Sequence, residues 1–379
     1  MAKSPEASKT KQTLSRTPLF EVCVESNARM TEFSGWEMPV QYSGIKQEHK
    51  AVRTAAGMFD ISHMGKFTLK GKDLITKLQY LVPSDLSRLQ PGEAKYTVLL
   101  NPQGGIIDDI IFYYQGQDDA GEHRGRTIVN AGTLAKDKAW LLENFQGSDV
   151  ELEDLSPEKA LIAVQGPDAI KHLQSLVDAD LSVVKNFGHI EGSVCGGMGF
   201  LARTGYTGED GFEVMVDPEV AVTLWRSLLE AGVTPCGLGC RDTLRLEAAM
   251  HLYGQDMDDR TTPLEAGLGW VVHLDRKGDF IGRSVLEEQK KAGLPRRLVA
   301  LEMQGRHIAR HGYAVQQQGE AVGEITSGSF SPTLERPIAL AYVPKKLAKS
   351  GQELDVVIRG KTHPGVVVKK PFYRSPHRA

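Results

Sequence analysis

The sequence predicts an α+β protein made of three folded regions, and three observations support this fold class. The chain has 379 residues, which at roughly 150 residues per domain suggests two or three domains. From residue 17 to about residue 290, short β-favouring runs are interspersed with helix-like runs. After Arg297 nearly every segment alternates in polarity or turns, which is typical of a small all-β domain.

The first expected region spans residues 17–150 and has a mixed α+β pattern. It follows residues 1–16, which are polar, lack apolar periodicity and are expected to form a flexible tail. Strands are expected at 64–71, 95–101, 106–114 and 126–132, and helices at 45–57 and 132–145. The acidic stretch 147–159 contains turn residues, so we expect a domain boundary or an exposed connection there.

The second expected region spans residues 151–285, and the third spans 286–379. The second has the order strand, helix, strand, strand, helix, which resembles ferredoxin-like packing. These elements are expected at 160–166, 167–177, 192–204, 211–217 and 218–232. A further helix at 241–254 leads into a polar connection at 255–267. The third region is expected to be all-β and jelly-roll-like.

Composition narrows the class of protein. Apolar residues make up 41% and charged residues 25%, as in an ordinary folded enzyme or binder. The net charge of −3 gives no general attraction to nucleic acids or anionic membranes. No apolar run approaches the ~20 residues that cross a bilayer. Four cysteines are too few for a disulfide framework, and no secretory segment precedes them, so we expect a cytoplasmic protein.

Several familiar motifs are absent or lack their context. The chain has no G-x-x-x-x-G-K-[ST] loop, and its TGYTGEDGF segment lacks the strand and helix of a dinucleotide site. The segment 326–331 lacks the second glycine of a nucleophile elbow. Cys236 and Cys240 are four residues apart, as are His307 and His311, yet neither pair has a complementary pair at zinc-site spacing. We therefore expect no metal.

Two adjacent acids interrupt the strongest β-favouring run of the chain, GGIIDDIIFYY. Because successive strand side chains point to opposite faces, Asp108 and Asp109 are not expected to share a proton as a dyad. At least one of the two carboxylates is expected beside apolar neighbours. That acid either caps a turn or pairs with an arginine, or it hydrogen-bonds an amine on a substrate and steers protons.

Two further segments carry candidate binding residues. The glycine-rich stretch TGYTGEDGFE allows close backbone approach and offers Tyr206 for stacking and Glu213 for accepting hydrogen bonds. Glu213 fits a half-buried site or a plain solvent-facing position. Arg241 and Arg245 share one helix face, where they can bind an anionic substrate or pair with Asp242.

Read in order, these segments resemble the aminomethyltransferase family, the T-protein of the glycine cleavage system. The resemblance runs from Thr17 to the C-terminus and includes SGWEMPVQY, MFDISHMGKF, NPQGGIIDDIIFYY, RTGYTGEDGFEVM, CGLGCRDTLRLEAAMHLYGQDMD and GEITSGSFSPTL. It implies three domains in a cloverleaf around a central hole that holds tetrahydrofolate, with the first two domains interleaved. It also implies that the lipoyl arm of a carrier protein, the H-protein, enters from the opposite side.

The resemblance assigns roles to particular residues. Asp109 matches the aspartate that hydrogen-bonds the folate nitrogens receiving the one-carbon unit, and is therefore the expected catalytic acid. Glu213 and Tyr206 match the residues that hold the pterin, and Arg241 matches a substrate-binding arginine. Other expected folate-pocket residues are Tyr96, Met64 and, near the C-terminus, Arg378. Some members of the family have a tyrosine where this chain has Met250.

Three alternatives remain open at this point. A folate-binding branch linked to iron–sulfur assembly resembles this chain but has a Lys-Gly-Cys-x-x-Gly-Gln signature, whereas residues 250–255 here lack the cysteine. Demethylating oxidases fuse a similar module to a flavin domain, for which 379 residues leave no room. A non-catalytic tetrahydrofolate carrier would keep Glu213, Tyr206 and Arg241 but tolerate changes at Asp109.

Overall fold

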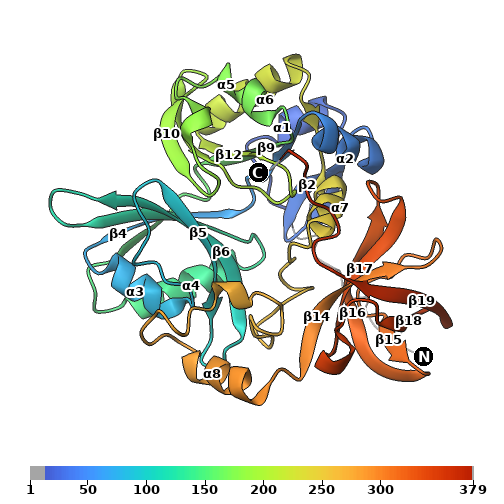
Figure 1. Ribbon diagram of the computed structural model, residues 1–379. Coiled ribbons are helices and arrows are strands. Elements are labelled where there is room, and N and C mark those ends of the chain that lie inside the picture. Colours follow the sequence, from blue (N-terminus) through green and yellow to red (C-terminus); the bar gives the residue numbers. More distant parts are fainter. Residues whose placement is uncertain (1–12, 378–379) are drawn as a thin grey trace, which may run out of the picture.

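A computed structural model describes residues 13–377, which form three lobes (Figure 1). Two lobes combine helices with a β-sheet, and the third is a closed β-barrel. The predicted α+β fold class with a C-terminal all-β domain is therefore confirmed. Arg378 and most of the tail predicted at residues 1–16 lie outside the described residues. Within residues 13–377, none of the helices has the length and apolar character needed to span a membrane.

The first lobe contains a five-stranded sheet in the order β5-β6-β7-β4-β8. Its strands are β4 (Gly65–Gly71), β5 (Glu93–Leu100), β6 (Ile106–Gln117), β7 (His123–Val129) and β8 (Glu151–Asp154). Helices α3 (Leu74–Leu81) and α4 (Leu134–Phe145) pack on one face of this sheet, where Leu78 and Leu141 meet Ile110 and Phe112 of β6. The opposite face of β6 carries Tyr113, which packs in a separate core shared with the second lobe.

Strand β8 lies in the acidic stretch that the sequence predicts as a connection. It pairs antiparallel with β4 at the edge of the sheet, and its side chains are alternately exposed and half-buried. An edge strand with a charged, solvated face resembles a loop in composition, which explains the difference.

The second lobe contains a six-stranded sheet in the order β10-β11-β12-β9-β3-β13. Its strands are β3 (Gly57–Asp60), β9 (Ala160–Gln165), β10 (His189–Val194), β11 (Gly197–Ala202), β12 (Gly211–Val216) and β13 (Thr234–Pro235). Helices α1 (Phe20–Glu25), α5 (Ala169–Gln174) and α6 (Pro218–Glu230) cover one face, burying Trp225 against the sheet. The same core includes Leu19 and Met58, from the beginning of the chain.

This arrangement interleaves the first two predicted regions. Strand β3 belongs to residues 17–150 in chain order, yet it pairs with β9 in the sheet of the second lobe. The boundaries at residues 150 and 285 stay a proposal about the order of the regions along the chain.

A hairpin replaces the single strand expected at residues 192–204. Strands β10 and β11 pair with each other across Cys195 and Gly196, which have φ angles of 48° and 85°. Two consecutive residues with positive φ suit the right-handed twist of a two-residue hairpin turn. Cysteine gives no sequence signal for this conformation, so the turn was missed.

The third lobe is a closed barrel in the order β14-β17-β16-β15-β18-β19. Its strands are β14 (Arg296–Met303), β15 (Ala314–Gln317), β16 (Glu320–Ser331), β17 (Arg336–Pro344), β18 (Glu353–Ile358) and β19 (Lys361–Val368). Helix α7 (Leu238–Glu247) joins this barrel to the second lobe, and its Leu246 packs on Leu298 and Leu340. The remaining elements are β1 (Arg29–Phe33), β2 (Trp36–Gln41), α2 (Ile45–Thr54), α8 (Arg283–Ala292), and the 3₁₀ turns at Leu181–Val183, Gly269–Val271 and Lys345–Leu347.

Helix α7 ends earlier than the predicted helix at 241–254. Ala249 has a left-handed φ of 54°, and its N–H donates to Leu246 while the N–H of Met250 donates to the carbonyl of Arg245. These two bonds form a Schellman termination, which usually has glycine at the left-handed position. Because alanine is not typical of a helix end, the sequence does not predict that α7 ends at this point.

Candidate active site

Asp109 lies on β6, on the face that points toward the second lobe. Side chains alternate along a strand, so Asp108 lies on the side of α3 and α4 together with Ile110 and Phe112. Asp109 lies on the side of Tyr113, between the lobes. Asp108 is fully buried, whereas Asp109 keeps partial exposure. The two acids therefore have the opposite orientations that the sequence predicts.

Two side chains hold the Asp109 carboxylate. The Tyr96 hydroxyl donates to Asp109 Oδ2 over 3.1 Å, and the Asn130 side-chain amide donates to Oδ1 over 2.9 Å. Val98 is directly opposite Asp109, so Tyr96 is a diagonal neighbour on the same face. Asn130 follows the end of β7, where continuation of the β6–β7 register brings it opposite Asp109.

The Asn130 amide also joins Asp109 to Asp108. Its nitrogen lies 2.8 Å from Asp108 Oδ1, so one amide donates to both carboxylates. Burial raises the pKa of Asp109, and the neighbouring negative charge of Asp108 raises it further, to about 7. A carboxyl that titrates near neutral pH is able both to accept and to release a proton under ordinary conditions.

Glu213 lies on β12 in the core between the lobes. The Thr204 hydroxyl donates to Glu213 Oε2 over 2.6 Å and is itself 3.1 Å from the Tyr113 hydroxyl. Burial raises the pKa of the Glu213 carboxyl. The neighbouring Gly205 has no space for a side chain, because an added Cβ would lie 1.9 Å from Gln165 Oε1. This contact explains one glycine of the TGYTGEDGF motif.

Tyr206 and Arg241 form a stacked pair. The Arg241 guanidinium lies 4.7 Å from the centre of the Tyr206 ring, and the Tyr206 hydroxyl donates to the carbonyl of His251. Arg241 Nη1 is buried without an acceptor among the described residues. Burial lowers the pKa of Arg241, and the charge of Glu213 opposes that shift. A buried guanidinium nitrogen without a partner is costly, so a carbonyl or carboxylate of a ligand would satisfy it.

The structure brings most of the predicted site residues into one electrostatic neighbourhood. Burial raises the pKa of Tyr206, the charge of Asp109 adds to this rise, and the charge of Arg241 opposes it. Tyr206 in turn contributes to the raised pKa of Tyr96, after burial and Asp109. Met64 packs at the edge of the core that contains Tyr113. Arg378 lies outside the described residues, so its predicted role has no structural description. Arg245, the alternative to Arg241, donates to Asp242, Asp256 and Ser327.

Sequence reasoning missed several residues of this neighbourhood. Asn130 had only one signal, its position near the end of the strand predicted at residues 126–132. Thr204 precedes the glycine motif and gave no sign that it would hold Glu213. Trp270 is 60% exposed and stacks on Tyr96 with ring centres 5.6 Å apart, a contact between segments far apart in the chain.

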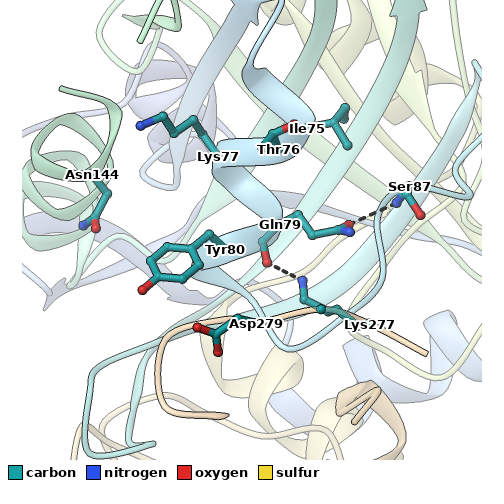
Figure 2. A pocket seen from close by; sticks show the side chains of 10 residues that line it. Ile75, Thr76, Lys77, Gln79, Tyr80, Ser87, Asn144, Lys277 and Asp279 are labelled. Atoms are coloured by element: carbon teal, nitrogen blue, oxygen red, sulfur yellow. Dashed lines mark hydrogen bonds between the residues drawn. The ribbon is translucent and has the colours of Figure 1, made fainter. Parts of the chain in front are cut away.

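A hollow of about 590 Å³ lies apart from these residues, beside α3 (Figure 2). Its wall includes Tyr80, Asn144 and Lys277, and none of the predicted site residues. The Lys277 ammonium donates to the carbonyl of Gln79 (Figure 2) and also to that of Ser84. Because Gln79 lies in the last turn of α3, this lysine satisfies a free helix carbonyl and has a structural role.

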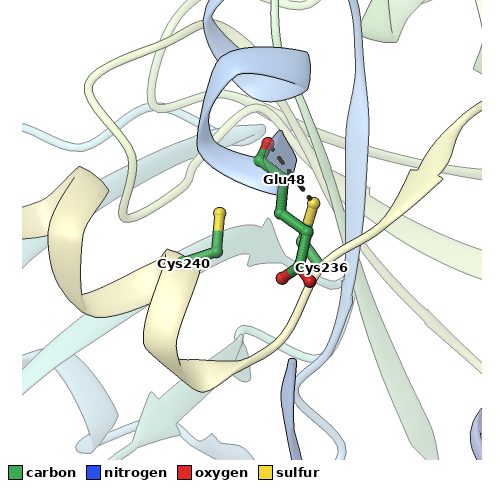
Figure 3. A group of neighbouring side chains, drawn as sticks. All are labelled: Glu48, Cys236 and Cys240. Carbon is green, nitrogen blue, oxygen red and sulfur yellow. Dashed lines mark hydrogen bonds between the residues drawn. The ribbon is translucent and has the colours of Figure 1, made fainter. Parts of the chain in front are cut away.

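Glu48, Cys236 and Cys240 form a buried group whose ligand atoms lie within 4.8 Å of one another (Figure 3). The Glu48 carboxylate already accepts hydrogen bonds from the backbone N–H groups of Tyr42, Gly44 and Gly237. Burial raises the pKa of Cys236 well above its usual value, which disfavours the thiolate that binds metals. These contacts identify a structural cluster, and the predicted absence of a metal stays a prediction.

Comparison with known proteins identifies the family. Residues 19–276 match the GCVT N-terminal domain, and residues 296–374 match the glycine cleavage T-protein C-terminal barrel domain. The fold and the matched domains thus define a protein of the GCVT class. The chain belongs to the glycine cleavage T-protein family of aminomethyltransferases.

Individual relatives agree along nearly the whole chain. The aminomethyltransferase of Nostoc sp. is 68% identical over 369 residues, covering 97% of this chain and 98% of the relative. That of Rippkaea orientalis is 66% identical and covers 96% and 99%. The crystal structure of glycine cleavage system aminomethyltransferase T from Bartonella henselae has a TM-score of 0.89 and 33% identity, covering 96% of this chain and 99% of that one. These matches do not favour the iron–sulfur or carrier alternatives.

Proposed function

We propose that this aminomethyltransferase of glycine cleavage carries out its reaction at the site around Asp109. The observation that carries the proposal is a carboxyl of pKa about 7, held by Tyr96 and Asn130 at the face between two lobes. The substrates are an aminomethyl group on a lipoyl carrier protein and tetrahydrofolate. The products are 5,10-methylenetetrahydrofolate, ammonia and the dihydrolipoyl carrier.

The reaction mainly requires orientation and proton transfer. Two bonds form between the methylene carbon and the two folate nitrogens, while its bonds to the amine nitrogen and to the lipoyl sulfur break. The two folate N–H protons end on ammonia and on the released thiol. Asp109 hydrogen-bonds the folate nitrogen and accepts its proton, a role typically worth ~10²–10⁴ in rate. Proximity of the two substrates supplies much of the remaining acceleration.

The pterin is proposed to bind between Glu213, Tyr206 and Arg241. Glu213 would accept hydrogen bonds from pterin N–H groups, and the Tyr206 ring would cover the flat heterocycle. The buried Arg241 Nη1 would donate to a ligand oxygen. Tyr96, Met64 and Arg378 are proposed as further contacts to folate.

The proposed partner is a lipoyl carrier protein, and the proposed compartment is the cytoplasm. The aminomethyl group arrives on the H-protein, the lipoyl carrier of glycine cleavage, and folate acts as a substrate, with no metal required. The four cysteines are free thiols, three of them buried, which fits a reducing compartment such as the cytoplasm.

The test is tetrahydrofolate-dependent release of ammonia from an aminomethylated lipoyl carrier protein. Wild type should release ammonia, and Asp109→Asn should lose at least about 100-fold in turnover at saturating folate. Asp275→Asn is the matched control, because the Asp275 side chain is exposed and its ion pair is with the surface residue Lys290. Near wild-type turnover by Asp109→Asn would refute the assignment of the catalytic acid.

A further inference from the structure

A third carboxyl, Asp137, lies behind the two acids of β6. It occupies the first turn of α4 and is fully buried on the side of the sheet where Asp108 lies. Both of its carboxyl oxygens are buried, and by geometry neither forms a hydrogen bond to a described residue. Its nearest polar interactions are with Asp108, together with Thr133 and the charge of Lys136.

Two facing carboxyl groups without a donor between them need a proton. Within the described part of the chain, Asp108 accepts hydrogen bonds from neutral donors, and the Lys136 ammonium is bound to the Tyr253 hydroxyl over 2.8 Å. Two neighbouring negative charges in a buried site would repel strongly. Burial, followed by the charge of Asp108, raises the pKa of Asp137 to about 10, so Asp137 holds a proton at neutral pH and donates it to Asp108.

The Asp137 proton completes a set of donors around Asp108. The Thr133 hydroxyl and the backbone N–H of Asn130 donate to Asp108 Oδ2, over 2.8 Å and 3.1 Å. The Asn130 amide donates to Oδ1 and, with its second hydrogen, to Asp109. The position of Asp108 therefore determines where the Asn130 amide lies, and that amide fixes one oxygen of Asp109.

We infer that Asp137 is a positioning residue for the catalytic site: its carboxyl proton anchors Asp108, which orients the Asn130 amide that holds Asp109. The inference rests on the proposed function of Asp109. An amide does not relay protons between carboxylates, so Asp137 acts through orientation and charge and not as a proton donor to substrate. The chain of contacts is short and buried, and small displacements of a reacting group are costly in rate.

A merely structural role predicts different behaviour. Asp137→Leu replaces a buried carboxyl whose oxygens lack a hydrogen-bond partner among the described residues with an apolar group of similar size, so the melting temperature should change little. If Asp137 only supported the fold, activity would follow the folded fraction. If it positions Asp109, activity falls while the protein remains folded.

The experiment compares Asp137→Asn with Asp137→Leu in the folate-dependent ammonia assay. The asparagine amide still donates to Asp108, so this variant should retain most of the wild-type kcat. Asp137→Leu should lose about tenfold in kcat with the KM for tetrahydrofolate changed less than about twofold. Glu143→Leu, an exposed acid on the same helix, controls for an apolar substitution on α4.

The outcomes separate this inference from the proposed function. Wild-type kcat in Asp137→Leu, or equal losses in both variants, would overturn the inference. Should Asp137→Leu fail to fold, infrared spectroscopy of the near-isosteric Asp137→Asn still tests it, because the band of the protonated carboxyl must disappear and its persistence would overturn the inference. An active Asp109→Asn would instead refute the proposed function.

Discussion

Two buried acidic clusters of this protein differ in how they are neutralised. Around Glu247 on α7, Arg53 and His49 lie 2.9 Å and 3.1 Å from the carboxylate, and Thr333 and Ser331 donate further hydrogen bonds. Burial alone would raise the Glu247 pKa, but these partners lower it to about 2. Around Asp109 the donors are a tyrosine and an amide, the nearest charge is another acid, and the pKa rises to about 7.

The Glu247 cluster contributes to stability, whereas the Asp109 cluster is suited to proton transfer. The Glu247 cluster joins α2, α7 and the barrel, and the Glu247 carboxylate stays ionised at every ordinary pH. The Asp109 cluster keeps a proton available near neutral pH at the expense of stability. Both carboxyl groups lose most of their contact with water, yet their pKa values shift in opposite directions, because one cluster contains cations and the other does not.

The largest expected effect is on turnover, from Asp109→Asn. We expect a loss of at least about 100-fold in kcat, because the amide does not accept the folate proton. Ammonia release at saturating folate measures the effect. Glu247→Gln, in contrast, should retain turnover per folded molecule, and an equal loss in kcat there would erase the distinction between the two clusters.

The largest expected effect on stability comes from Glu247→Ala. Removal of this carboxylate takes one of two carboxylates from the buried Arg53, which keeps Glu209, and leaves the hydroxyls of Ser331 and Thr333 without their acceptor. The loss should cost about 3–5 kcal/mol of unfolding free energy. Urea unfolding measures the change, and Glu158→Ala at an exposed position should change stability by less than about 0.5 kcal/mol. A change below about 1 kcal/mol for Glu247→Ala would show that the cluster is not a stabilising one.

Arg241 and Arg245 lie one helical turn apart on α7 and differ in whether protein groups accept their hydrogen bonds. Arg245 is satisfied by protein groups, whereas Arg241 Nη1 is not. Arg241→Gln should therefore raise the KM for tetrahydrofolate about tenfold with little change in melting temperature. Arg245→Gln should lower the melting temperature instead. The reverse result would assign the ligand to Arg245.

The pH dependence of stability tests Asp109 without any substrate. Its pKa is raised from 3.8 to about 7, so its favourable contribution is present below pH 4 and is lost as pH rises through 7. Asp109→Asn should then be more stable than wild type above pH 7, with the difference shrinking toward pH 4. Thermal unfolding across this range is the measurement, and a constant difference would contradict the raised pKa.

The smallest expected effect concerns the end of α7. Ala249 adopts a left-handed conformation, which costs an L-residue about 1 kcal/mol relative to glycine. Ala249→Gly should stabilise the protein by roughly that amount in urea unfolding. A loss of stability would mean that the alanine methyl group makes a packing contact of greater value.

Local sequence signals predicted much of the fold but only part of the site. The run around Asp108 and Asp109 is so strongly β-favouring that its strand, and the opposite orientation of the two acids, followed from the sequence alone. Helix α7 was predicted, but its end was not, because Ala249 takes a position normally marked by glycine. The hairpin at Cys195 was missed for the same reason.

Tertiary contacts determine those features of the site that the sequence does not predict. Arg241 and Arg245 have equivalent spacing in the sequence, and only Asp256 and Ser327 from other segments distinguish them. Asn130 joins two acids that alternation alone would separate, because the strand register brings its amide between them. Asp137 gave no signal, since an acid in the first turn of a helix is ordinary in sequence terms.

The most direct test of this account is an infrared titration of wild type minus Asp109→Asn, following the C=O band of a protonated carboxyl between pH 4 and pH 9. We predict a band that disappears with a midpoint near pH 7, the value that burial and Asp108 give to Asp109. A band already lost by pH 5 would show that Asp109 is an ordinary carboxylate and contradict the account.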